Sequence, residues 1–491
     1  MPDIHYQSAT EMLESLRSGA MTSVALTEAL IARINSHNPK INALITLAAD
    51  DALKQAAEAD AKRQRGESLG PLHGLPMTLK DTWEVAGLHC IAGAPALRDY
   101  VPEHNADLVQ RLRDAGAIVL GKTNVPFYAM DLQSYNRVFG TTNNPYNPEH
   151  TPGGSSGGAA AALAAGLIPL DVGSDLAGSI RTPAHFCGVF GHKATQNLIS
   201  MRGHIPGPPG TLTPPDLVVP GPMARTAADL EMLLNVIAGP RPLDARSWSL
   251  NMEPARITDL RSARVGLWLS DPLCPVDDHL TDAYRSLGQK LEQAGSLVAD
   301  AKHELLDLNH ILPAYFNLLG SLVSGNMPPK QRRQMAMVAR FETWIRRFFP
   351  MTAHMGEYGR GVNQPIYQWA SWTETRLKMR ARIDELFADI DVLLTPITPT
   401  TAPPHNQKGE AFSRRITVNG KQRPYTDQFC WIAFATLLGL PATSVPIGRT
   451  AEGLPYNVQV IGAPGSDLTT LKFAQLLEKE GLAGFSPPPG Y

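Results

Sequence analysis

Two serines and a lysine that lie far apart in the chain are of types that can perform nucleophilic chemistry together. Ser179 follows Ser155 by 24 positions and Lys80 by 99 positions. A serine hydroxyl at its ordinary pKa is a weak nucleophile and requires a base. A lysine can act as that base near neutral pH only where burial lowers its pKa from about 10.4. The mostly apolar segment Leu75–Leu79 before Lys80 predicts such burial.

The elements around the two serines predict rigid support for both. Gly153–Gly158 leads directly into Ala159–Ala165, a helix-forming tract that Gly166 can end in a left-handed cap. A second loop, Gly173–Ser179, follows a short apolar strand, and Pro183 after it suits the first turn of another helix. The two serine-bearing turns are therefore expected to be held by one strand and one helix.

These loops and the lysine resemble the amidase signature family, whose catalytic unit is a serine, a second serine in a cis peptide, and a lysine. The separations of Lys80, Ser155 and Ser179 also match that family. The resemblance covers most of the chain and weakens between residues 240 and 385. It includes the segments Gly121–Asn124, Asn143–Pro145, Gly439–Ala442 and Gly453–Pro455.

The resemblance implies a role for each residue of the unit. Ser179 would attack an amide carbonyl and form an acyl-enzyme, while Ser155, in a cis peptide with Gly154, would relay the proton to Lys80 as the base. Neither a cofactor nor a metal is implied. The oxyanion hole, where losing one donor typically costs about 10²- to 10³-fold in rate, would be formed by the backbone N–H groups of Leu176, Ala177, Gly178 and Ser179.

Other residues near the unit are expected to support it or to contact the substrate. Asp175 and Arg181 flank the turn, and their expected role is structural, because a carboxylate beside the nucleophile would oppose the developing negative charge. The family commonly has glycine where this chain has Ala177, and the extra methyl narrows the space beside the carbonyl. Ala129, with Tyr128 beside it, lies where the family contacts substrate.

The sequence around the glycine-rich segments and Ser179 argues against nucleotide-binding motifs and the α/β-hydrolase motif. Gly116–Thr123 matches the phosphate-binding loop pattern, but its central residues are those of an apolar strand, and Pro126 follows where a helix should continue. Gly153–Gly158 is preceded by a turn-rich segment, which a dinucleotide fingerprint would not allow. Ser179 lacks the Gly-x-Ser-x-Gly elbow of α/β-hydrolases.

The histidines and cysteines do not form a metal or disulfide pattern. The chain has 14 histidines without an HExxH pair, and His185 and His192 beside the loops are expected to pack or hydrogen-bond. The four cysteines are widely spaced without a C-x-x-C pair, and Cys187 lies in an apolar stretch typical of a buried thiol.

Composition excludes some classes of partner. The net charge of the 491 residues is -2 and no long basic run occurs, so no nucleic acid partner is expected. The polar N-terminal segment lacks the plan of a signal peptide, and no apolar run reaches bilayer length, which predicts a cytoplasmic protein without a membrane partner. The expected partner is a small-molecule amide substrate, with a homodimer left open.

Alternating helix and strand signals predict an α/β fold with a mixed, largely parallel central sheet that helices cover on both faces. One amidase domain is expected over 1–491, with a signature core at about 70–235 and 390–480 and a variable helical region on the substrate side at about 300–387. A capping box at Ser8 opens the first helix, and a second helix is expected over Thr22–Ile34. Strands are expected at 75–80, 117–120, 167–172, 265–269, 392–395, 443–447 and 457–461.

Two further segments have more than one interpretation. Pro206–Pro222 carries seven prolines, too many for a helix or a central strand, and fits a stiff surface loop or a lining of the active-site entrance. Phe341, Trp344, Phe348 and Phe349 have helical spacing. They are interpreted as a packed helix face, and the alternative is a roof over a substrate pocket.

The expected activity is hydrolysis of a carboxylic amide to an acid and an amine or ammonia, with esters or carbamates as further candidates. One alternative is a glutaminase-type subunit that delivers ammonia to a partner subunit. Another is a scaffold without catalytic activity, which the presence of Lys80, Ser155 and Ser179 disfavours.

Overall fold

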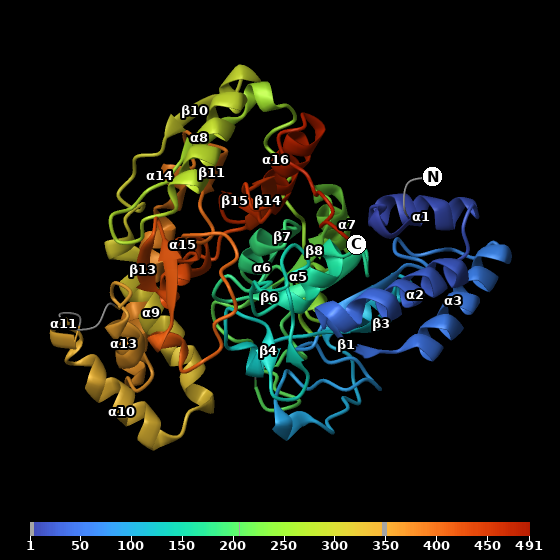
Figure 1. The fold of residues 1–491 in the computed structure, drawn as a ribbon, viewed down its shortest axis with the longest axis horizontal. Helices are drawn as coiled ribbons and strands as arrows, with labels where there is room; N and C mark the ends of the chain where they lie inside the picture. The colour runs from blue at the N-terminus through green and yellow to red at the C-terminus, as the bar shows by residue number, and fades with distance from the viewer. Residues whose placement is uncertain (1–3, 206, 346–350) are drawn as a thin grey trace.

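A computed structural model describes residues 4–205, 207–345 and 351–491. Its central element is a mixed sheet of eight strands (Figure 1). In spatial order the strands are β10 (Leu297–Asp300), β9 (Arg264–Leu267), β11 (Val392–Thr395), β15 (Pro455–Ile461), β14 (Ala442–Arg449), β7 (Phe190–Lys193), β8 (Val219–Ala224) and β6 (Leu170–Asp175).

The α/β class with a mixed sheet is confirmed, but the expectation of largely parallel pairing is wrong. Only the pairs β10–β9 and β9–β11 are parallel, and the other neighbours in this described sheet are antiparallel. One cause is the short turn between β14 and β15, since a hairpin connection forces antiparallel pairing. The other is β8, which inserts between β6 and β7 and runs antiparallel to both.

Smaller β elements surround this sheet. A three-stranded sheet has the order β1 (Leu44–Leu47), β3 (Ile118–Thr123) and β2 (Pro76–Lys80), with β2 and β3 parallel. Two antiparallel ladders complete the β structure: β4 (Tyr135–Asn136) with β5 (Gly140–Thr141), and β12 (Arg415–Val418) with β13 (Lys421–Pro424).

Helices cover both faces of the central sheet, as β7 shows. Successive strand residues point to opposite faces. A Cβ on Gly191 would meet Ile180 and Ala184 beside and within α6 (Arg181–Phe186), whereas His192 Nε2 contacts Asp467 Oδ1 of α16 (Asp467–Lys479) at 3.1 Å. The two helices therefore lie on opposite faces.

The first helices confirm their predicted caps. α1 (Ala9–Ser18) begins with the Ser8–Glu11 capping box, and α2 begins after its N-cap Thr22 but extends further than expected, over Ser23–Ile41. The other helices near the sheets are α3 (Ala49–Gln64), α4 (Asp107–Asp114), α5 (Gly157–Ala164), α7 (Ala227–Ile237), α8 (Asp278–Gln293) and α15 (Cys430–Leu437).

The helical character expected between residues 300 and 387 is confirmed, and Figure 1 shows these helices gathered at the end of the molecule opposite α1–α3. They are α9 (Leu308–Val323), α10 (Pro329–Ala339), α11 (Glu342–Ile345), α12 (Gly356–Gly361), α13 (Ile366–Ala381) and α14 (Ile383–Leu386).

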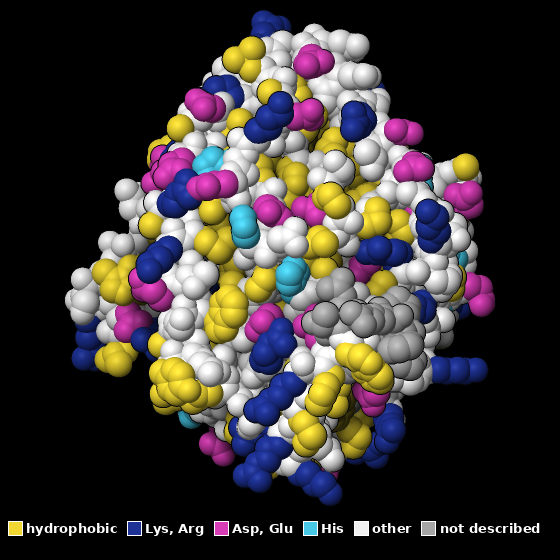
Figure 2. Space-filling view, turned by 90° about the vertical axis from the view of Figure 1, so that its left-hand side faces the viewer, with side chains coloured by type: hydrophobic (Ala, Val, Ile, Leu, Met, Phe, Trp, Pro, Cys, Tyr) yellow, Lys and Arg dark blue, Asp and Glu magenta, His cyan; other side chains and the backbone are white. Residues whose placement is uncertain are grey.

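The interpretation of the aromatic cluster as a packed helix face is wrong for the members that the structure describes. Phe341 is 57% exposed and Trp344 is 60% exposed, while Phe348 and Phe349 lie outside the described residues. In Figure 2, apolar and basic side chains intermingle over this end of the molecule. Helical spacing alone does not say whether an apolar face is covered by another element.

The proline-rich segment contains a strand that the sequence argument excluded. β8 carries Pro220 and Pro222, which lie opposite Ser174 and Val172 of β6. On its other side β8 pairs with β7 only through Met223 and Ala224. The prolines are tolerated because this part of the strand has a ladder on one side only. The preceding residues 208–213 are mainly exposed, as a surface loop would be.

Candidate active site

The two serine-bearing loops meet at the ends of β6, α5 and α6. Ser155 lies two residues before α5, whose N-cap is Ser156, and the Gly154–Ser155 peptide is cis. Gly154 lies against the backbone of Asp131–Gln133, so that a Cβ would come within 2.7 Å of Asp131 O. Gly166 adopts a φ of 66° after the helix, as predicted for its left-handed cap.

Lys80, the last residue of β2, reaches both loops. Its Nζ hydrogen-bonds Ser155 Oγ at 2.7 Å, Ser174 Oγ at 3.0 Å and the Ser174 carbonyl at 3.3 Å. The lysine side chain is fully buried, and Ser155 and Ser174 are 1% and 4% exposed. The structure thus brings the predicted base and the predicted relay serine into direct contact.

Burial also changes the protonation of this lysine. It lowers the pKa of Lys80 to about 7, against the opposing influence of the Asp175 and Asp171 carboxylates. Asp171 is itself buried, which raises its pKa to about 6 despite hydrogen bonds from Thr78 and Thr123. An amine with a pKa near 7 is free to accept a proton at neutral pH, as a general base must.

Ser179 lies on the second loop, which is tied to the first through the backbone. The N–H of Ser156 donates to the Ser179 carbonyl at 3.1 Å. Ser179 is 8% exposed and is therefore largely shielded from solvent. This bond places the predicted nucleophile beside the Ser155–Ser156 segment.

Asp175 and Arg181 hold the second loop in shape, as predicted. The Asp175 carboxylate pairs with the Arg181 guanidinium at 2.8 Å and accepts backbone N–H groups from Gly178, Ile180 and Arg181. Burial alone would raise the pKa of Asp175, but Arg181 holds it at about 2. Arg181 also donates to Thr436 and Gln459, which links the loop to the late part of the chain.

These contacts correct one member of the predicted oxyanion hole. The Gly178 N–H donates to Asp175 Oδ1 at 3.0 Å and is not available to a ligand. Gly178 instead supplies a φ of 88°, and a Cβ there would lie 2.6 Å from Thr182 Oγ1. The N–H groups of Leu176, Ala177 and Ser179 have no acceptor among the described residues.

Comparison with known proteins agrees with this arrangement. The family model described as "Amidase" matches residues 25–471. The chain belongs to the amidase signature family. It is 34% identical over 495 residues to a glutamyl-tRNA(Gln) amidotransferase subunit from Chloroflexus aurantiacus, and the match covers 98% of this chain and 97% of the relative.

Solved structures show the same fold. A protein from a vestigial complex that reveals the origins of an s-triazine catabolic enzyme is similar with a TM-score of 0.80 and 28% identity, over 98% of this chain and all of that one. The 6-aminohexanoate cyclic dimer hydrolase complexed with substrate is similar with a TM-score of 0.76 and 27% identity, over 99% of both chains.

In this member of the family, the segment Phe127–Met130 forms a candidate wall beside the site, which we call the rim. The Tyr128 N–H donates to Ala92 O, and Ala92 donates to Asp81, the neighbour of Lys80. Phe127 and Met130 are 53% and 45% exposed. Tyr128 and Ala129 have φ values of 49° and 57°, a costly conformation that is frequent at ligand-binding segments. Contact of Ala129 with a substrate stays a prediction.

Sequence reasoning missed two residues that contact the lysine network. Ser174 precedes Asp175, and His204 Nε2 lies 2.9 Å from Ser174 Oγ. The His204 ring also packs against Trp83 with its centroid 4.5 Å away. The signal available was the alternation of β6, which points Ser174 and Val172 to the same side; no local pattern marks His204.

The histidines and cysteines that the sequence analysis considered are hydrogen-bonded or buried in the fold. His185 accepts the Asn457 N–H, and His192 bonds Asp467 and Thr443. All four cysteines are buried free thiols, and burial raises the pKa of Cys187 well above its usual value. Across residues 4–205, 207–345 and 351–491, no His, Cys, Asp or Glu cluster could hold a metal ion, and no helix has the length and apolar character to cross a bilayer.

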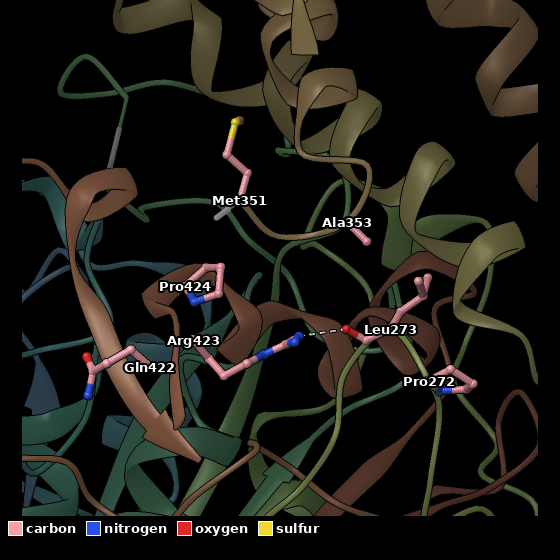
Figure 3. Close-up of a pocket in the computed structure, with 7 residues that line it drawn as sticks. All are labelled: Pro272, Leu273, Met351, Ala353, Gln422, Arg423 and Pro424. Carbon is pink, nitrogen blue, oxygen red and sulfur yellow. Dashed lines mark hydrogen bonds between the residues drawn. The ribbon is translucent and has the colours of Figure 1, made fainter. Parts of the chain in front are cut away.

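A cavity of about 230 Å³ lies elsewhere, beside the β13 end of the small ladder (Figure 3). Within it, Arg423 donates to Leu273 O at 2.8 Å and pairs with Asp427. The described lining does not include the lysine or either of the two serines. The lining residues are Pro272, Leu273, Met351, Ala353, Gln422, Arg423 and Pro424.

Proposed function

We propose that this family member hydrolyses a neutral amide with an apolar group, without a partner subunit, through an acyl-enzyme on Ser179. The observation that carries the proposal is the 2.7 Å contact between Lys80 Nζ and Ser155 Oγ, in a loop bonded to the Ser179 backbone. This contact joins the buried base, Lys80, to the relay hydroxyl of Ser155. Ser179 lies beside them, with free backbone N–H groups nearby.

In the first step, Ser179 Oγ attacks the amide carbonyl carbon and forms a C–O bond. Its proton passes to Ser155, whose own proton passes to the neutral Lys80 amine, because a hydroxyl can donate and accept at once. The negative charge that develops on the carbonyl oxygen is stabilised by N–H donors of Leu176, Ala177 and Ser179.

In the second step, the C–N bond breaks and the leaving nitrogen takes the proton held by Lys80, again through Ser155. The free amine departs and leaves an ester on Ser179. Water then attacks this ester while the same relay removes its proton, and the acid is released as Ser179 recovers its hydrogen. The relay is thus used in both directions.

The preference for a neutral, apolar substrate rests on the rim and its charged neighbours. The exposed rim side chains Phe127 and Met130 are apolar. Asp131 next to them is occupied by Arg414 at 2.7 Å and by the Tyr425 hydroxyl at 2.8 Å. An ionic substrate would have to break this ion pair, whereas an apolar group would bury rim surface.

The amidotransferase relatives favour a second candidate, a glutaminase-type subunit that passes ammonia to a partner. The member of that group from Chloroflexus aurantiacus shares 34% identity over nearly the whole chain. A glutaminase must bind the ammonium and carboxylate of its substrate. The charged residues beside the rim are paired with each other, which supports the neutral amide instead.

Amine release by the purified chain tests the proposal. Aliphatic and aryl amides, carbamates and glutamine would be supplied without ATP or a partner, beside Ser179→Ala. Turnover of apolar amides that the variant lacks is the expected result. Turnover of glutamine alone would favour the second candidate, and turnover that persists in Ser179→Ala would exclude the acyl-enzyme.

A further inference from the structure

His204 extends the lysine network beyond the groups that the proposed mechanism uses. Lys80 Nζ contacts Ser174 Oγ at 3.0 Å, and the same oxygen lies 2.9 Å from His204 Nε2. Among the described residues, these two nitrogens are the hydrogen-bond partners of the Ser174 hydroxyl. The direction of its O–H therefore depends on His204.

The number of hydrogens on Lys80 decides which direction is useful. A neutral amine has two N–H donors and one lone pair, and the lone pair must face Ser155 to accept its proton. The two N–H groups are then left for the carbonyl and the hydroxyl of Ser174, at 3.3 and 3.0 Å. A hydroxyl that accepts from Lys80 must donate to another group.

We propose that His204 is a positioning residue, whose Nε2 accepts a hydrogen bond from the Ser174 hydroxyl and so keeps the lone pair of Lys80 free for Ser155. This inference rests on the proposed acyl-enzyme function. In the opposite tautomer, Nε2–H donates to Ser174, and the Ser174 hydroxyl then donates to Lys80. The lone pair is occupied in that arrangement and the base is blocked.

The surroundings of His204 keep its ring neutral, so that Nε2 can accept. Burial and the charge of Lys80 lower the pKa of His204 well below its usual value. Two carboxylates, those of Asp175 and Asp171, also influence the pKa of Lys80, and both belong to β6. Trp83 packs edge-on against the imidazole and fixes its plane. Nδ1 is shielded from solvent and has no described partner in either tautomer.

Two substitutions separate the acceptor from the packing of the ring. His204→Phe keeps an aromatic ring beside Trp83 and removes the acceptor, whereas His204→Gln removes the ring and keeps an acceptor at similar reach. Loss of the hydrogen bond is expected to slow His204→Phe about tenfold in kcat with little change in KM. His204→Gln is expected to recover most of that loss.

Labelling of Ser179 by a fluorophosphonate probe measures the same effect without an identified substrate. The Ser179 oxygen forms a bond to phosphorus, fluoride leaves with the electron pair of its P–F bond, and the serine proton passes to Lys80 through Ser155. His204→Phe should label about tenfold more slowly than the wild type and His204→Gln. His310→Phe, on the exposed start of α9, is the matched control, and thermal melting checks folding.

The outcomes separate this inference from the proposed function. Wild-type labelling that is lost in Ser179→Ala, with slow His204→Phe and restored His204→Gln, supports both. Normal labelling of folded His204→Phe, or slow labelling of His204→Gln alone, overturns the role of Nε2 and leaves the acyl-enzyme standing. Wild-type labelling that persists in Ser179→Ala overturns the proposed nucleophile itself.

Discussion

The floor of the proposed active site, which we define as Lys80, Ser155, Ser174 and Ser179, differs from the rim in how far its side chains are exposed. On the floor every residue is less than one-tenth exposed, and the buried Lys80 amine has hydrogen-bond partners in Ser155 and Ser174. On the rim, Phe127 and Met130 expose about half of their apolar surface. Lowering the pKa of a lysine requires removal from water, whereas a substrate wall must remain open. The two regions therefore satisfy opposite requirements within one site.

Ser179→Ala is expected to have the largest effect, because it removes the atom that forms the acyl bond. Turnover should fall on the order of 10⁵-fold or more. Amine release and probe labelling measure it, with Ser156→Ala as the neighbouring control, whose buried hydroxyl has no described partner. Equal loss of turnover in both variants would contradict the assignment of Ser179 as the nucleophile.

Lys80→Met should reduce turnover by about 10²- to 10⁴-fold, the usual contribution of a general base. In the wild type, burial lowers the pKa of Lys80 to about 7. The lysine is protonated below that pH and cannot accept a proton, so activity should rise through pH 7 to a plateau. The pH–rate profile of kcat/KM measures this, and the rise should vanish in Lys80→Met.

Lys193→Met is a control of the same type, because burial also lowers the pKa of Lys193 to about 7. Its Nζ donates only to backbone carbonyls in the described structure, those of Ala194 and Leu440. Its loss should reduce stability and leave the rise through pH 7 in place. If the rise were lost in Lys193→Met, the titration would belong to Lys193 and not to Lys80.

Asp175→Asn tests the frame that holds the floor and should lower stability by about 3–5 kcal/mol, because Arg181 would remain buried without its charge partner. Denaturant unfolding measures the change. The pKa of Asp175 is held at about 2, below its usual value of 3.8. Its contribution to stability is therefore present in full above the usual pKa and is lost as the pH falls through the lowered one.

The double variant Asp175→Asn, Arg181→Met shows whether the pair acts as a unit. Because neither charge then remains buried alone, the double variant should lose less stability than the sum of the single variants. Additive losses would mean that the two side chains contribute independently.

Phe127→Ala on the rim is expected to have the smallest effect, a change of about tenfold or less in the relative rates of aryl and aliphatic amides. Ser179 labelling should stay near the wild-type rate. Trp344→Ala is the comparison, since Trp344 is 60% exposed on α11, and it should leave the relative rates unchanged. Altered preference in Trp344→Ala would support the alternative that this aromatic cluster roofs a substrate pocket.

The sequence predicted three of the four floor residues and missed Ser174. Spacing and family resemblance placed Lys80, Ser155 and Ser179 in one site, and local signals predicted the helix after Ser155 and its cap. The engagement of the Gly178 N–H could not be predicted, because it depends on the fold of the Asp175 turn. His204 belongs to a segment with no motif, and only tertiary packing brings it to Ser174.

The same limit explains the errors in the fold. The prolines of β8 argued against a central strand, but a residue's tolerance in a sheet depends on which neighbour it faces. The spacing of Phe341 and Trp344 indicated one helix face without showing what covers it. Local patterns predict elements, and long-range pairing decides their environment.

The late part of the chain supports the proposed catalytic unit, which lies in the early part. Lys80, Ser155 and Ser179 all lie in the first two-fifths of the chain, yet Arg181 behind the nucleophile is held by Thr436 and Gln459. A fragment that ends after residue 224 would contain every proposed catalytic group and lack the strands at 442–461 that support them. Recombination could therefore exchange the helices of 308–386 between relatives more readily than it could transplant the serines.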